Sequence, residues 1–280
     1  MRLRAAAVLL VALLASAAVG GCASSAPTGP ATAPSVMPGS GSGEPVELLV
    51  LGAASLQGAL QQAATAYEAA TPGVRITVAT DSSAALATRV EQGAPGDVFL
   101  SADTRNPERL VAGGFVAGEP VVFASNSLAV VVPAGNPAKL TSPADLARPG
   151  VLVIAAGEGV PLTGYASELV ANLALQPGYP ADFAAAYAAN VVTREATARA
   201  VVAKLELGEG DAGIVYLTDA RASSGVTSLE VPEGANVTAT YEGVALRESD
   251  HPEAAAAFLA WMAGPGGREI LGPMGFGPAP

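Results

Sequence analysis

Short apolar runs and helical periodicities alternate along most of this chain. The run Val46–Leu51 has the length of a buried strand, and the apolar residues from Leu56 to Tyr67 recur at helical spacing. Pro72-Gly73 ends that helix. The pattern then predicts a strand over 74–79, a helix over 84–92 and a strand over 97–101.

The same alternation continues towards the C-terminus. Further strands are predicted over 128–132, 151–156, 212–217, 227–231 and 238–243, and helices from 142 and over 165–175, 181–189, 197–207 and 252–262. Strands that alternate with helices favour an α/β fold with parallel sheets covered on both faces. The region from residue 46 onwards is long enough for one large domain or for two lobes of about 100 residues each.

The first residues are typical of an exported protein. Arg2 and Arg4 precede an apolar run, Ala5–Val19, that is too short for a permanent membrane helix of about 20 residues. The sequence Val19-Gly20-Gly21-Cys22 resembles the bacterial lipobox, in which the cysteine receives lipid after the signal is cut. We therefore predict a signal peptide over 1–21 and lipidation of Cys22. The alternative is an ordinary signal peptide with a chance cysteine.

The composition of the chain from residue 22 onwards limits the classes of function that it can have. Residues 22–45 are rich in Ala, Ser, Pro, Thr and Gly, which predicts a flexible tether. A formal net charge of −11 argues against a nucleic-acid partner. Cys22 and His251 are the only cysteine and histidine, which leaves little for metal binding or nucleophilic catalysis. We expect neither an enzyme nor a cofactor.

Two loops share one design, because each follows a predicted strand and carries a serine where a helix starts. These serines are Ser55 and Ser83. A serine there can cap the helix with its hydroxyl. The same geometry is an anion site, because free backbone N–H groups and the helix dipole point at one spot. Both interpretations stay open from the residues alone, and Tyr216, at the end of a predicted strand, is equally open.

Several motifs together carry a family resemblance. They include Gly52-Ala53-Ala54-Ser55-Leu56, Ser82-Ser83 with Leu86-Ala87, Gly93 to Asp103, Asn126-Ser127-Leu128, Val160-Pro161 with Tyr165-Ala166, Gly213 to Tyr216 with Asp219-Ala220, and Gly275-Phe276. In this order and spacing they resemble the periplasmic molybdate-binding proteins of ATP-driven (ABC) importers, over almost all of 46–280.

The resemblance implies a two-lobed periplasmic-binding-protein fold of type II. Each lobe would be a mostly parallel sheet flanked by helices, with the ligand in the cleft between them. Lobe 1 would comprise 46–124 plus 232–280 and lobe 2 would comprise 125–231, with hinges near 124–127 and 230–232. The ligand would be a molybdate or tungstate oxyanion, held by neutral donors alone.

The resemblance also implies a set of site residues. The hydroxyl and backbone N–H of Ser55 and Ser83, the backbone N–H of Leu162 and Ala198, and the hydroxyl of Tyr216 would bind the oxyanion. The family often has Ala-Gly where this chain has Leu162-Thr163, Val-Arg where it has Ala198-Arg199, and a serine where it has Ala84. The first two changes leave backbone donors in place, whereas Ala84 removes a hydroxyl. Asp97 and Asp103 would be structural.

The implied partners are an ABC permease and, through Cys22, the outer face of the cytoplasmic membrane; a monomer is expected. Four alternatives remain. They are a receptor for another small anion such as sulfate, an iron receptor, a secreted hydrolase with His251 as base, and an adhesin without a ligand. The iron receptor would need adjacent tyrosines, and none of the six tyrosines is adjacent to another.

Overall fold

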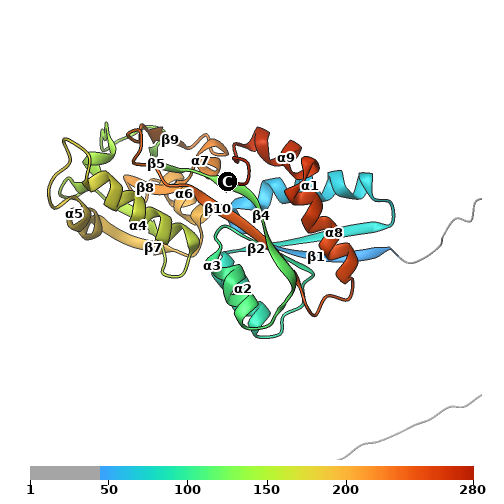
Figure 1. Ribbon diagram of the computed structural model, residues 1–280. Coiled ribbons are helices and arrows are strands. Elements are labelled where there is room, and N and C mark those ends of the chain that lie inside the picture. Colours follow the sequence, from blue (N-terminus) through green and yellow to red (C-terminus); the bar gives the residue numbers. More distant parts are fainter. Residues whose placement is uncertain (1–44) are drawn as a thin grey trace, which may run out of the picture. The chain divides into compact units, whose positions relative to one another are not determined.

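A computed structural model describes residues 45–280, and these residues belong to one compact unit (Figure 1). The predicted signal peptide, Cys22 and almost all of the predicted tether lie outside the described residues. Within residues 45–280 no helix has both the length and the hydropathy needed to cross a membrane.

The first sheet is built from the chain before residue 127 and after residue 238. Its strands, in the spatial order β2-β1-β3-β10-β4, are β2 (Val74–Asp81), β1 (Val46–Ala53), β3 (Val98–Ser101), β10 (Ala239–Leu246) and β4 (Val116–Asn126). β1 pairs in parallel with β2 and β3, whereas β10 pairs antiparallel with β3 and β4. Four of these strands therefore run in one direction, and β10 is reversed.

The second sheet repeats this arrangement with the intervening residues. Its order is β7-β6-β8-β5-β9, with β7 (Val191–Glu195), β6 (Val153–Ala156), β8 (Ala212–Tyr216), β5 (Leu128–Pro133) and β9 (Val226–Leu229). β6 is parallel to β7 and β8, and β5 is antiparallel to β8 and β9. The predicted α/β class with two mostly parallel sheets is confirmed.

Helices cover both faces of the first sheet. Val50 of β1 shares a buried cluster with Leu60 of α1 (Gln57–Ala70), and Leu51 shares another with Leu86 of α2 (Ser83–Glu91). Successive residues of a strand point to opposite faces, so a strand covered on both sides needs an unbroken apolar run. This is why Val46–Leu51 could be assigned from sequence.

The remaining helices alternate with the strands along the chain. They are η1 (Ala54–Leu56), α3 (Arg105–Ala112), η2 (Pro143–Ala147), α4 (Pro161–Ala174), α5 (Phe183–Asn190), α6 (Ala198–Glu206), α7 (Leu217–Arg221), α8 (Pro252–Ala263), α9 (Pro265–Leu271) and η3 (Gly272–Met274). In the second half, buried Leu173 of α4 and Leu205 of α6 pack with Ile214 of β8.

Five of the α-helices and strands, α3, β4, β7, α7 and α9, were not predicted. In β4, Gly118 has a φ of +80° and the pairing with β10 contains register shifts, so no regular alternation marks the strand. α8 ends at Ala263, and Pro265-Gly266-Gly267 begins α9 directly after it. A Cβ on Gly267 would lie 1.8 Å from the Met262 carbonyl oxygen, so this glycine permits the close turn between the two helices.

The chain passes between the sheets twice. β4 ends at Asn126 and β5 begins at Leu128, and the return runs from the end of β9 at Leu229 to the start of β10 at Ala239. Asn126 is still paired with Ala239 in the first sheet. The lobe boundaries and hinge positions stay predictions.

Candidate functional site

Ser55 lies in η1, between the end of β1 and the start of α1. Neither η1 nor α1 has a side-chain cap, so the Ser55 hydroxyl does not cap a helix. Its Oγ lies instead 2.9 Å from the hydroxyl oxygen of Tyr241.

Ser83 is the first residue of α2, and the residue that caps this helix is the preceding Ser82. Ser82 Oγ accepts from the N–H of Ala85 at 3.2 Å. The Ser83 Oγ accepts from the backbone N–H of Ala102 at 3.0 Å, and Ser83 is 1% exposed. Capping therefore accounts for Ser82 but not for Ser83, whose hydroxyl proton stays available for a further acceptor.

Tyr216 ends β8, and its side chain is 2% exposed. Its hydroxyl oxygen is buried and has no hydrogen-bond partner among the described residues. Burial, followed by the neighbouring Tyr241 and Tyr165, raises the pKa of Tyr216 well above its usual range. The phenol is therefore neutral at physiological pH and can donate one hydrogen bond, and a buried unpaired donor of this kind is costly unless a ligand meets it.

The two predicted backbone donors lie at helix starts. Leu162 is the second residue of α4, and Ala198 is the first residue of α6. Backbone N–H groups in a first helical turn have no partner within the helix. At α6, Thr197 Oγ1 accepts from the N–H of Ala200 at 3.1 Å, which leaves the Ala198 N–H outside this cap.

The structure brings four of the five predicted residues, Ser55, Ser83, Ala198 and Tyr216, to one small cavity, which we call the anion cavity. Leu162 does not line it, although Val160 and Pro161 do. The cavity has a volume of about 20 Å³. Its full lining is Ala53, Ala54, Ser55, Ser82, Ser83, Ala102, Val160, Pro161, Thr197, Ala198 and Tyr216.

The electrostatics of the anion cavity come from helix ends. The N-termini of α2, α4 and α6 all contribute lining residues, and no lining residue carries a charge. Each N-terminus carries a partial positive charge and unpaired N–H groups. These helix ends favour an anion at the cavity and offer it neutral donors only.

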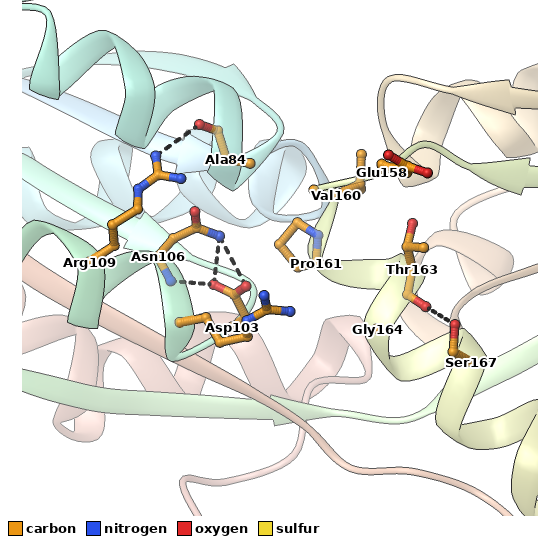
Figure 2. A pocket seen from close by; sticks show the side chains of 12 residues that line it. Ala84, Asp103, Asn106, Arg109, Glu158, Val160, Pro161, Thr163, Gly164 and Ser167 are labelled. Atoms are coloured by element: carbon orange, nitrogen blue, oxygen red, sulfur yellow. Dashed lines mark hydrogen bonds between the residues drawn. The ribbon is translucent and has the colours of Figure 1, made fainter.

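A larger cavity of about 340 Å³ shares Val160 and Pro161 with the anion cavity, and Figure 2 shows its lining. Asp103 lies on its wall, where the Asn106 side chain donates to both carboxylate oxygens at 3.0 and 2.9 Å. Ser101 Oγ also donates to Asp103, at 2.7 Å. The carboxylate is thus held by its own loop.

Asp97 is held in a similar way. Its carboxylate accepts from the backbone N–H of Leu49 at 2.6 Å and from the hydroxyl of Ser249. These bonds join the start of β3 to β1 and to the segment after β10, so both aspartates act within the scaffold.

Sequence reasoning missed the residues behind Ser55. Tyr241 of β10 is fully buried, and Asn126 at the end of β4 donates to its hydroxyl oxygen at 3.3 Å. No spacing along the chain connects Ser55 with Tyr241, because the two residues are brought together by the pairing of β1 with β3 and of β3 with β10.

The folded region is similar to known proteins. Residues 48–277 match the family of bacterial extracellular solute-binding proteins. The molybdate-binding protein ModA of Mycobacterium tuberculosis is 36% identical over 230 residues, which cover 82% of this chain and 84% of that protein. The aconitate isomerase of a Pseudomonas species is 28% identical over 240 residues, covering 83% of this chain and 88% of that protein.

A solved structure agrees with the fold. The sulfate-binding protein SubI of Mycobacterium tuberculosis superposes with a TM-score of 0.74 at 22% identity, covering 83% of this chain and 87% of that chain. The chain belongs to the family of bacterial extracellular solute-binding proteins, and the predicted resemblance is confirmed at that level.

Proposed function

We propose that the folded part binds molybdate, and also tungstate, in the anion cavity. The observation that carries this proposal is the cavity itself, where three helix N-termini and the unpaired Tyr216 hydroxyl meet without any charged side chain. The similarity to the mycobacterial molybdate-binding protein supports the choice of anion.

Neutral donors are sufficient for useful affinity. A dissociation constant between micromolar and nanomolar needs roughly 8–12 kcal/mol. Each hydrogen bond to a charged group contributes about 1.5–3 kcal/mol net. About six donors, the hydroxyls and backbone N–H groups of Ser55 and Ser83, the backbone N–H of Ala198 and the hydroxyl of Tyr216, reach this range if closure around the anion excludes water.

The proposal includes the route of the anion. The chain would be held at the outer face of the cytoplasmic membrane through lipid on Cys22, as a monomer, and would pass its anion to an ABC permease. The family membership supports an extracytoplasmic receptor. The lipobox-like sequence before Cys22 supports the anchor.

Two alternatives predict different results. A sulfate receptor would share the fold, as SubI does, but would bind sulfate more tightly than molybdate. An enzyme, like the related aconitate isomerase, would need a base at its ligand. His251 lies at the start of α8 and lines neither cavity, and Asp103 is already engaged by Asn106 (Figure 2).

The experiment is a calorimetric titration of residues 43–280 with molybdate, tungstate, sulfate and phosphate. We expect tight binding of the first two only. Ser228→Ala, in an exposed part of β9, is a matched control for serine substitutions in the cavity and should titrate like the unaltered protein. Tighter binding of sulfate would replace the proposed ligand.

A further inference from the structure

A chain of hydrogen bonds reaches the anion cavity from behind Ser55. The Tyr241 hydroxyl lies 2.9 Å from Ser55 Oγ, and Asn126 Nδ2 lies 3.3 Å from the Tyr241 oxygen and 2.8 Å from Thr218 Oγ1. Tyr241 is fully buried and does not line the anion cavity. Among the described residues, the hydrogen bond to Ser55 is the one that links the Tyr241 hydroxyl to a residue of the cavity lining.

The direction of these bonds follows from Asn126. The backbone N–H of Ser127 donates to Asn126 Oδ1 at 2.9 Å. A backbone N–H can only donate, so this bond identifies the amide oxygen and leaves Nδ2, a donor, facing Tyr241. The Tyr241 oxygen accepts from Nδ2, which leaves the Tyr241 proton for its other hydrogen-bond partner, Ser55 Oγ.

Ser55 is then left with one role towards the cavity. Burial raises the pKa of Tyr241 far above its usual range, so its hydroxyl keeps the proton that it donates. Because Ser55 Oγ accepts from Tyr241, the Ser55 proton is free to point at a bound anion.

We propose that Tyr241 is a positioning residue for anion selectivity, because it holds the Ser55 hydroxyl as a donor towards the cavity. This inference rests on the proposed function. A wall that only donates suits an oxyanion without protons, such as molybdate. A Ser55 hydroxyl released from Tyr241 can rotate and accept a hydrogen bond. It can therefore accept one from the O–H group that phosphate retains near neutral pH.

The substitution Tyr241→Phe tests the hydroxyl without emptying the core. The Tyr241 ring makes edge-to-face contacts with Phe123, Tyr216 and Phe276 at centroid distances of 6.1, 5.8 and 5.4 Å. Phenylalanine keeps these contacts, and Asn126 keeps its bond to Thr218.

Two effects are expected in calorimetric titrations of residues 43–280. Tyr241→Phe should weaken molybdate binding by about threefold to tenfold, the effect of one ordinary hydrogen bond. Phosphate binding should stay the same or strengthen, so the ratio of the phosphate Kd to the molybdate Kd should fall by at least the same factor.

The double variant shows whether the effect passes through Ser55. In a Ser55→Ala background, Tyr241→Phe should cause no further change in either Kd, since residues that act as a unit are not additive. Tyr165→Phe is the matched control. Its hydroxyl bonds to the backbone of Thr240 and its ring lies 6.5 Å from that of Tyr216, so its loss should leave the ratio unchanged.

The outcomes separate this inference from the proposed function. If the unaltered protein binds molybdate and Tyr241→Phe leaves both Kd values unchanged, or changes them equally with and without Ser55, the positioning role is refuted and the function stands. If the unaltered protein prefers sulfate, the proposed ligand is wrong, and the same cycle with sulfate still decides the role of Tyr241. If no oxyanion binds, both are refuted.

Discussion

Replacing Tyr216 with phenylalanine should make the empty protein more stable and the binding of molybdate weaker. The Tyr216 hydroxyl is buried without a partner in the described chain, and a buried unsatisfied group of this kind costs about 1–3 kcal/mol. Tyr216→Phe removes that cost and keeps the ring. The sign of this change distinguishes a residue held ready for a ligand from an ordinary core tyrosine, whose loss of a hydrogen bond would destabilise the protein.

The size of the effect follows from the cavity. Its volume of about 20 Å³ exceeds the 10–15 Å³ that one water needs, so a water can relieve part of the cost in the empty protein. We therefore expect a gain of about 1 kcal/mol, or a rise in melting temperature of about 2–4 °C. For the complex, losing a donor to a charged group costs about 1.5–3 kcal/mol, a loss in affinity of roughly 10-fold to 150-fold.

Thermal unfolding without ligand and titration with molybdate measure the two effects separately. Tyr67→Phe is a useful comparison, because Tyr67 packs against Phe258 and Trp261 and does not line the anion cavity. A lower melting temperature for empty Tyr216→Phe together with an unchanged Kd would refute the reasoning.

Three further predictions address other parts of the chain. Ser83→Ala should weaken molybdate binding by about 1–3 kcal/mol and also lower the melting temperature, because it leaves the Ala102 N–H unpaired; unchanged values in titration and unfolding would contradict this. Burial raises the pKa of Asp219 to about 7 against the opposing charge of Arg199, so its contribution to stability is present below about pH 4 and is lost as the pH rises through 7. Asp219→Asn should accordingly stabilise the protein at pH 8 by a few kcal/mol at most, with a difference that disappears towards pH 4 in a pH series of unfolding curves. Cys22→Ala should move the full-length protein from the membrane fraction to the soluble fraction, and continued sedimentation with membranes would argue against the lipid anchor.

The parts of the fold that sequence could predict are those covered on both faces. β1 is apolar at every buried position and β3 at all of them except Ser101, and α1 shows a clear stripe of small and apolar residues. β4 and α9 could not be predicted from sequence, because their geometry depends on contacts with other elements of the fold. β4 is irregular where it pairs with β10, and α9 depends on a glycine pressed against the end of α8.

Part of the candidate site could likewise be predicted from sequence, and part of it could not. Ser55, Ser83 and Tyr216 stand at junctions between a strand and a helix, which the local pattern marks. Ser55 and Ser83 meet because they follow neighbouring parallel strands, β1 and β2, of the first sheet, whereas Tyr216 ends β8 of the second sheet. The support behind Ser55 comes from Tyr241, 186 residues away. The orientation of a hydroxyl proton depends on such distant partners, so local sequence could suggest the donors but not their direction.

The most direct measurement is the rise in melting temperature of residues 43–280 with each of four oxyanions at equal concentration. Ligand at a thousandfold excess over Kd stabilises the fold by about 4 kcal/mol, which corresponds to on the order of 10 °C for a protein of this size. Molybdate and tungstate should give this rise. Sulfate should give far less because it is smaller and cannot reach every donor at good length, and phosphate should give far less because its proton would face donors alone. A larger rise with sulfate or phosphate, or none with any of the four, would contradict the assignment of this chain as a molybdate receptor.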